Sequence, residues 1–336
     1  MAVRLTLDRR IKLLCDLGVY MESNDLAWMD AQDKAAQANA WFTPAHIALA
    51  TDNMANQFLQ KDKLAMWVAN YLIPKEIKTV GIVMAGNIPL VGFHDFLCGF
   101  VSGHNLILKL SSKDEILLKH LIDKLSEWEP VVTEQVTIAE RLNNCDAYIA
   151  TGSNNTARYF EQYFGKYPHI IRRNRTSVAI LDGSETNEEL ALLADDVYMY
   201  YGLGCRNVTQ LCVPHNFDFA RLLQVFNKHN DYADLNKYKN NYDYHLALYL
   251  LNKVPYMSNE SLLMVENDLP FSAVSVLHYK FYDNREQLTD QLKNNPDIQA
   301  IIGKGFVPFG DSQMPALSDY ADGVDTMAFL CGLPQP

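Results

Sequence analysis

Short apolar runs that alternate with longer helical patterns constrain the fold of this chain most strongly. Residues 79–85 form a run rich in β-branched side chains, and similar runs follow at 106–110, 136–138 and 147–150. Helical periodicity separates the first three runs. Buried strands of parallel sheets have such continuous apolar sequences, and strands that alternate with helices indicate a parallel sheet covered on both faces. The pattern therefore predicts an α/β fold.

A second series of strands and helices is expected from Ser177 onward, and the first 72 residues show helical periodicity alone. A chain of 336 residues suits two lobes. We therefore expect a helical N-terminal region and first domain at 1–177, and a second domain at 178–336. Strands of the second domain are expected at 177–181, 208–213, 262–265, 273–279 and 298–302, and helices at 187–201, 217–251 and 285–293.

Composition excludes several classes of function. The formal net charge is -11 and the pI is about 5.3, which argues against general nucleic-acid binding because that requires a basic surface. The six cysteines are scattered, without a C-x-x-C pair or zinc-ligand spacing, as is typical of a reducing compartment. Neither a signal peptide nor a transmembrane run is evident. We expect a cytoplasmic protein without a metal, a nucleic-acid partner or a membrane span.

Polar residues follow three of the predicted strands of the first domain. Asn87, Lys109 and the pair Gly152-Ser153 lie at or just past the strand ends, where the ligands of parallel sheets bind. Each has an ordinary alternative: Asn87 as a turn residue, Lys109 as a solvated lysine and Ser153 as a helix N-cap. Their common position makes a ligand site the interpretation to test.

The stretch 200–208 connects a predicted helix to a predicted strand and contains Gly202, Gly204 and Cys205. Glycine permits backbone angles closed to other residues and lets a second molecule approach closely. A cysteine on such a turn is a candidate nucleophile, because a nearby helix end or cation lowers the thiol pKa. The alternative is a small buried core residue.

The order of these motifs resembles the aldehyde dehydrogenase superfamily, and in particular the acyl-CoA reductase family typified by the fatty-acid reductase of bacterial bioluminescence. The resemblance rests on a strand with an Asn-x-Pro turn, a strand ending in lysine, a strand with a Gly-Ser turn, a Gly-x-Gly-Cys turn and a C-terminal acidic motif. These motifs are at residues 80–90, 103–109, 146–153, 201–207 and 319–326. The resemblance covers about 79–330.

The resemblance implies an aldehyde dehydrogenase-like fold with two Rossmann-like lobes, and an activity that reduces an acyl-CoA to an aldehyde with NADPH. It implies that Cys205 forms an acyl-cysteine and that the Asn87 amide stabilises the oxyanion with the Cys205 N–H. Lys109, Gly152 and Ser153 would contact NADPH. A ribose-binding carboxylate would be Glu266, with Asp268 as the alternative.

Arg172 departs from the pattern of oxidative relatives, which carry a water-activating glutamate where this chain has arginine. A missing base suits an enzyme that does not hydrolyse its acyl intermediate, and it also suits reductases of acyl phosphates. Arg172, Arg173 and Arg175 could bind a phosphate or form a solvated loop. An acyl-protein substrate, a non-catalytic cofactor-binding relative, a homo-oligomer and a partner enzyme supplying acyl groups also stay open.

Overall fold

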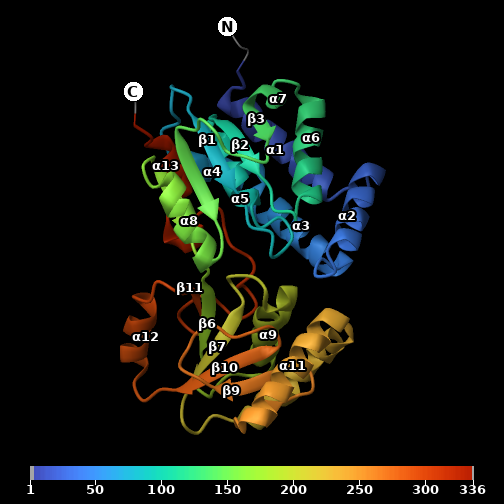
Figure 1. Cartoon of the computed structure of the whole chain (residues 1–336), viewed down its shortest axis with the longest axis vertical. Coiled ribbons are helices and arrows are strands. Elements are labelled where there is room, and N and C mark those ends of the chain that lie inside the picture. Colours follow the sequence, from blue (N-terminus) through green and yellow to red (C-terminus); the bar gives the residue numbers. More distant parts are fainter. Residues whose placement is uncertain (1–3, 335–336) are drawn as a thin grey trace. The chain divides into compact units, whose positions relative to one another are not determined.

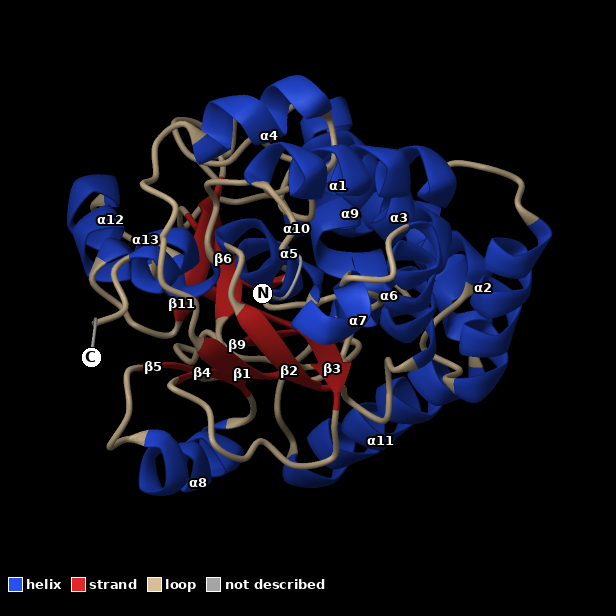
Figure 2. Cartoon of the chain, turned by 90° about the horizontal axis from the view of Figure 1, so that it is seen from above, coloured by secondary structure: helices blue, strands red, loops and turns tan. Residues whose placement is uncertain are grey.

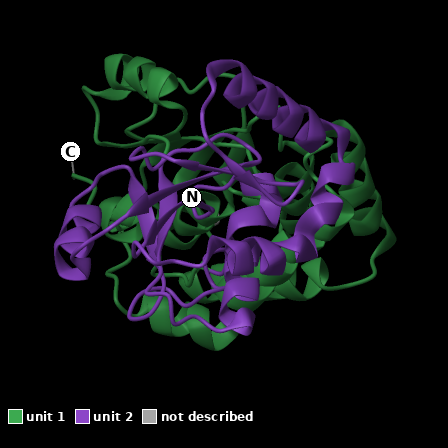
Figure 3. Ribbon diagram, turned by 90° about the horizontal axis from the view of Figure 1, so that it is seen from below, with its two compact units in different colours: residues 1–174, 315–336 green, residues 175–314 purple. Residues whose placement is uncertain are grey.

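The computed structural model describes residues 4–334 and divides into two compact units, coloured in Figure 3. Unit 1 comprises Met1–Asn174 and Pro315–Pro336, and unit 2 comprises Arg175–Met314. The expected division placed the whole C-terminal segment in the second domain. That assignment is wrong for 315–336, because Tyr320 and Met327 are buried in the hydrophobic core of unit 1.

Unit 1 begins with helices whose ends follow their sequence signals (Figure 1). The side chains of Thr6, Asp25 and Thr43 accept backbone N–H bonds at three N-caps, and Pro44 is the first residue of its helix. Apolar residues at three- and four-residue spacing face the core, as the periodicity predicts. These helices are α1 (Leu7–Met21), α2 (Leu26–Ala38), α3 (Pro44–Phe58) and α4 (Lys61–Val68).

The sheet of unit 1 has five parallel strands in the order β3-β2-β1-β4-β5, visible in Figure 2. The chain moves outward from β1 to β3 and then returns to the other side of β1, which is the strand order of dinucleotide-binding folds. Helix α8 lies on the opposite side of the sheet from α5 and α6. The strands are β1 (Thr79–Val83), β2 (Asn105–Lys109), β3 (Val136–Ile138), β4 (Ala147–Thr151) and β5 (His169–Arg172); the helices are α5 (Phe93–Ser102), α6 (Ile116–Trp128), α7 (Val132–Gln135) and α8 (Asn154–Phe164).

The C-terminal segment closes unit 1 with the 3-10 turn η3 (Ala321–Gly323) and helix α13 (Thr326–Cys331), which packs against α5. The Trp67 Nε1–H donates to the Tyr320 hydroxyl at 2.8 Å, and the Tyr71 hydroxyl donates to Asp325 at 2.9 Å. These bonds attach the segment to the N-terminal helices.

Unit 2 contains a six-stranded sheet in the order β11-β6-β7-β10-β9-β8, parallel except for the edge strand β8. The parallel α/β organisation predicted from the sequence is confirmed in both units. Strands are β6 (Thr176–Ile180), β7 (Val208–Val213), β8 (Met257–Ser258), β9 (Leu263–Glu266), β10 (Val276–Phe281) and β11 (Ile298–Ile302); helical elements are α9 (Asn187–Tyr198), η1 (Met199–Gly202), α10 (Phe219–Phe226), η2 (Asn227–Asp234), α11 (Asn236–Asn252) and α12 (Arg285–Lys293).

The segment between β2 and α6 differs from what its sequence indicates, in a way that affects the site. Ser111 and Ser112 followed by Asp114 are typical of a helix N-cap and first turn, but α6 begins only at Ile116. The intervening residues form a turn in which the Asp114 N–H donates to the Ser111 carbonyl at 2.9 Å. Asp114 is consequently buried between β2 and α6 and does not face solvent.

Candidate active site

The chain enters the Cys205 region through a turn of left-handed backbone. After α9, Tyr200, Tyr201 and Gly202 have φ angles of 53°, 57° and 73°. Left-handed backbone costs a non-glycine residue about 1–2 kcal/mol, so two such residues in succession need strong support from their surroundings. Both tyrosines are buried, which provides part of that support.

Asn207 provides further support, because its fully buried amide bonds to backbone groups that precede Cys205. Its Oδ1 accepts from the Gly204 N–H at 2.8 Å. Its Nδ2 donates to the carbonyls of Asp196 at 3.0 Å and Met199 at 2.8 Å, at the end of α9. Asn207 is part of the motif at residues 201–207, but the sequence did not predict this role. Its position two residues after Cys205 is the feature that could have indicated it.

Cys205 itself is half-buried, and its carbonyl accepts a hydrogen bond from the Ser177 hydroxyl at 3.2 Å. Desolvation by burial raises the thiol pKa of each of the other five cysteines, to about 11 for Cys212 and Cys331. A raised pKa keeps a thiol protonated at neutral pH and therefore poorly nucleophilic. Burial therefore disfavours these five cysteines as nucleophiles.

Asn87 lies in unit 1, half-buried in the loop after β1. This loop lies against the segment that follows β2. A Cβ added at Gly86 would lie 2.5 Å from the Ser111 Oγ, and the Leu90 N–H donates to the Asp114 Oδ2 at 2.6 Å. The structure thus brings together the two segments that the sequence singled out at Asn87 and Lys109.

Lys109 is the last residue of β2, paired in register with Val83 of β1, and is exposed. It lines a pocket of about 430 Å³ at the carboxyl ends of β2 and β3. Lys34 from α2 and Lys119 from α6 line the same pocket, and Lys34 is paired with Asp30 at 2.5 Å. Four carboxylates, Asp30, Glu115, Asp123 and Glu140, line the same pocket, so its lysines offer cations within a lining of mixed charge.

Gly152 and Ser153 connect β4 to α8 on the other side of β1. The Gly152 N–H donates to the Arg172 carbonyl at 3.2 Å, while the Ser153 hydroxyl accepts from the Thr156 N–H at 3.3 Å as the N-cap of α8. The ordinary interpretation of Ser153 therefore holds. The N-terminus of α8 still presents backbone N–H groups and a positive dipole end at the edge where ligands of such sheets bind.

Arg172 and Arg173 have different surroundings. Arg172 is buried; its guanidinium pairs with Asp95 at 2.5 Å and donates to the Thr326 hydroxyl at 2.7 Å. Arg173 is exposed and pairs with Glu161. Arg172 therefore lies neither in a solvated loop nor in a phosphate site shared with Arg173, because its charge is paired with Asp95 inside unit 1.

Glu266 lies at the carboxyl end of β9, where it pairs in register with Tyr279 of β10. Cys205 precedes β7, so the parallel strands place the two residues at opposite ends of the unit 2 sheet. The chain after β9 is held by Gln210, whose amide donates to the carbonyls of Asn267 at 2.8 Å and Leu269 at 3.2 Å.

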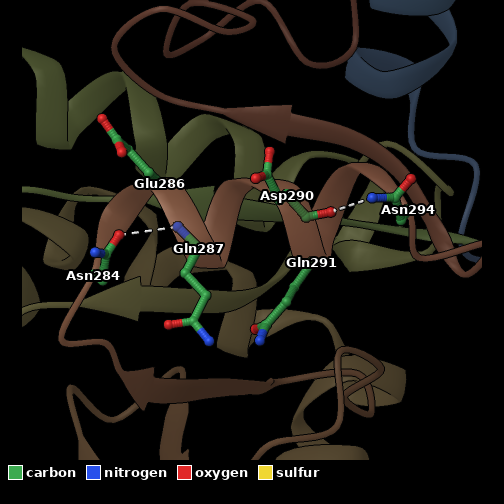
Figure 4. Close-up of a pocket in the computed structure, with 6 residues that line it drawn as sticks. All are labelled: Asn284, Glu286, Gln287, Asp290, Gln291 and Asn294. Atoms are coloured by element: carbon green, nitrogen blue, oxygen red, sulfur yellow. Dashed lines mark hydrogen bonds between the residues drawn. The ribbon is translucent and has the colours of Figure 1, made fainter.

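Figure 4 shows a shallow hollow along α12 that is a solvated helix surface. Its polar side chains make local contacts: Asn284 caps the helix by accepting from the Gln287 N–H at 3.0 Å, and Asn294 donates to the Asp290 carbonyl at 2.8 Å. Among residues 4–334, no group of three or more His, Cys, Asp or Glu side chains has the arrangement of a metal site. Nor does any helix of that range have the length and apolarity needed to cross a membrane.

Comparisons with known proteins agree with this architecture. Residues 57–216 match the family model described as acyl-CoA reductase (LuxC). Aldehyde dehydrogenase 21 from Physcomitrella patens, solved with the reaction product succinate, is 11% identical with a TM-score of 0.67, over 90% of this chain and 74% of that one. An oxidoreductase from Marinobacter aquaeolei is 10% identical with a TM-score of 0.65, over 90% and 74%.

A third similar structure is the NAD⁺ complex of an aldehyde dehydrogenase from Bacillus cereus, 12% identical with a TM-score of 0.62, over 87% of this chain and 70% of that one. A search of curated proteins gave no match. Identities this low establish the fold alone, whereas the family match includes the Asn87, Lys109 and Cys205 motifs. Residues 57–216 are therefore similar to the acyl-CoA reductase (LuxC) family, and the chain has an aldehyde dehydrogenase-like fold.

Proposed function

We propose that this protein reduces an acyl-CoA thioester to an aldehyde with NADPH, through a covalent acyl intermediate on Cys205. One observation carries the proposal: Cys205 is half-buried three residues after a turn of left-handed backbone, in a segment held by the Asn207 amide. Strained backbone that the surrounding structure holds in place is concentrated at functional sites. The similarity of residues 57–216 to the acyl-CoA reductase (LuxC) family supports the reaction class, the reduction of an acyl group.

In the first step Cys205 reacts as the thiolate, its proton having passed to solvent, and its sulfur bonds to the thioester carbonyl carbon. The bond from that carbon to the coenzyme A sulfur then breaks, and coenzyme A leaves as a thiolate that takes up a proton. The carbonyl oxygen carries negative charge in between. The Asn87 amide and the Cys205 N–H would donate hydrogen bonds to it, and one such donor is typically worth ~3 kcal/mol of barrier.

The residues of unit 1 fit a phosphorylated dinucleotide. The strand order is that of dinucleotide-binding folds, α8 begins beside β1 at the carboxyl edge, and Lys34, Lys109 and Lys119 line one pocket at that edge. These lysines would attract the 2′-phosphate that distinguishes NADPH from NADH, and the α8 N-terminus would meet the pyrophosphate. The similar Bacillus cereus enzyme was solved with NAD⁺.

When bound, NADPH supplies a hydride to the acyl carbon. The same donors, Asn87 and the Cys205 N–H, would stabilise the second oxyanion. The carbon–sulfur bond then breaks, the electron pair returns to Cys205, and the aldehyde leaves. Arg172 would not activate water for hydrolysis of the acyl-cysteine, because its side chain is cationic and buried against Asp95.

Intact-protein mass spectrometry tests the acyl intermediate. Mixing the protein with acyl-CoA in the absence of NADPH should release one coenzyme A per site as a burst and leave one acyl adduct. Peptide mapping should place the adduct on Cys205, and added NADPH should discharge it as aldehyde. Cys205→Ala should show neither adduct nor turnover.

Cys212 is the internal control, since burial raises its thiol pKa to about 11. An adduct on Cys212, or full turnover by Cys205→Ala, would remove covalent catalysis by Cys205 from the proposal. An acyl phosphate that acylates Cys205 where acyl-CoAs do not would make the protein a reductase of that donor. NADPH binding without any acylation would indicate a non-catalytic relative.

A further inference from the structure

The loop that carries Asn87 contacts one short segment, residues 111–114, on both sides of Asn87. Before Asn87, Gly86 lies so close to Ser111 that an added Cβ would be 2.5 Å from its Oγ and 2.6 Å from its Cβ. After Asn87, the Leu90 N–H donates to the Asp114 Oδ2 at 2.6 Å. Asn87 therefore lies in a short segment between two contacts with residues 111–114, one at Gly86 and one at Leu90.

Leu90 needs its attachment, because its φ angle is 56° and a leucine adopts left-handed backbone only at a cost. Its side chain is fully buried, so the residue cannot relax outward without exposing the core. The bond to Asp114 fixes the direction of the backbone at this point. Strain of this kind persists only where the surroundings determine it.

Asp114 is an unusual acceptor for this bond, because it is a buried carboxyl whose Oδ1 has no hydrogen-bond partner among the described residues. Burial raises its pKa to about 8, so the folded protein holds it mostly as the neutral acid at pH 7. A buried neutral carboxyl still accepts an N–H bond through its carbonyl oxygen. Asparagine can reproduce that arrangement, whereas alanine cannot.

We propose that Asp114 is a positioning residue of the active site, which holds the Asn87 amide in place through the Leu90 N–H. The inference rests on the proposed role of Asn87 as an oxyanion donor. The same segment begins two residues after Lys109, so the lysine of the pocket and the support of the Asn87 loop belong to one stretch of chain. Asp114 itself touches neither the substrate nor the cofactor in this proposal.

The first test compares Asp114→Ala with Asp114→Asn by hydrogen exchange, which needs no substrate. Asp114→Ala should exchange faster than wild type in peptides covering 86–91 and equally in α8. Asp114→Asn should match wild type in both. Equal exchange in wild type and Asp114→Ala, or faster exchange in Asp114→Asn as well, would overturn the proposal.

The second test measures kinetics with acyl-CoA and NADPH. Asp114→Ala should lower kcat roughly tenfold to a hundredfold while its NADPH affinity stays within about threefold, and Asp114→Asn should recover most of kcat. Loss of kcat in both variants would mean that the carboxyl acts other than as an N–H acceptor. The two proposals can fail separately. If the exchange pattern is as expected but the wild type does not reduce acyl-CoA, the proposed function is refuted and Asp114 still supports this loop.

A second pair of variants tests the other attachment and guards against misfolding of Asp114→Ala. Gly86→Ala should disturb the loop, because its Cβ would overlap Ser111. Adding Ser111→Gly to Gly86→Ala removes both atoms that lie closer than 3.0 Å, so kcat and exchange should move back towards wild type. No recovery in the double variant would refute the idea that residues 111–114 position the loop.

Discussion

Replacement of Asn207 by alanine is the sharpest perturbation of the proposed nucleophile turn. The amide accepts from the Gly204 N–H and donates to the carbonyls of Asp196 and Met199. Alanine removes all of these bonds without touching Cys205. The turn then loses its attachment to the end of α9, although the nucleophile itself is unchanged.

The expected loss of stability follows from the groups left behind. Each buried polar group without a partner costs about 1–3 kcal/mol. The four groups that lose the amide, the Gly204 N–H and the carbonyls of Asp196, Val197 and Met199, lie close together along the chain, so partial relaxation will reduce their sum. We expect the free energy of unfolding to fall by about 3–5 kcal/mol. Relaxation also relieves the left-handed residues Tyr200 and Tyr201, at about 1–2 kcal/mol each, which favours a shifted turn.

A shifted turn misplaces the Cys205 sulfur. Displacement of a reacting group by about 1 Å can cost a hundredfold in rate, so the burst of coenzyme A release should slow by roughly that factor. The assay is rapid-mixing measurement of the burst at saturating acyl-CoA, with urea unfolding of the same samples. The number of acylated sites should stay at one per chain.

Asn259→Ala is the matched control, since Asn259 is also buried and accepts from the Leu262 N–H at 2.9 Å while donating to the Tyr198 hydroxyl at 3.1 Å. It should destabilise the protein to a similar degree but leave the burst rate within about threefold of wild type. A wild-type burst rate in Asn207→Ala would refute the reasoning, as would an equal loss of rate in Asn259→Ala.

Three further predictions follow from groups in unit 1. The Asp114 pKa is about 8 in the folded protein and ordinarily 3.8. Between pH 3.8 and pH 8 the folded state keeps a proton that the unfolded state has lost, so the stability of the protein must fall as pH rises through this range. Asp114→Asn lacks this pH dependence. Urea titrations should therefore show its free energy of unfolding rising relative to that of wild type by on the order of 4 kcal/mol from pH 5 to pH 8. A difference between the two proteins that does not change with pH would contradict a buried neutral acid at Asp114. Lys109→Ala should weaken NADPH more than NADH in fluorescence titrations, and equal binding of both cofactors by wild type would be evidence against the 2′-phosphate assignment. Arg172→Glu should destabilise the protein by about 3–5 kcal/mol, because it places a carboxylate against Asp95, and it should not produce an acyl-CoA hydrolase; acid formation in a product assay would show that Arg172 had occupied the position of a water-activating base.

Local pattern was sufficient for the elements with strong periodicity. Strands β7 and β11 and helix α12 have the expected bounds, because each is a complete apolar or helical run between clear turn signals. The sequence also marked Asn87 and Lys109, because each lies at or just past the end of a buried strand. Strand β5 and helix α13 were not predicted, since both are short and their formation depends on contacts with distant residues.

Other features depend on pairs that no local pattern identifies. The C-terminal segment belongs to unit 1 because Tyr320 bonds to Trp67, and Arg172 is neutralised by Asp95 on α5. The start of α6 depends on the Asp114 turn, whose carboxyl is buried because the Leu90 N–H needs an acceptor. Sequence alone therefore determined the α/β elements and the strand-end residues, since periodicity and turn chemistry are local. Tertiary structure decided which side chains hold those residues in place, because a hydrogen bond to a buried group depends on chain segments that only folding brings together.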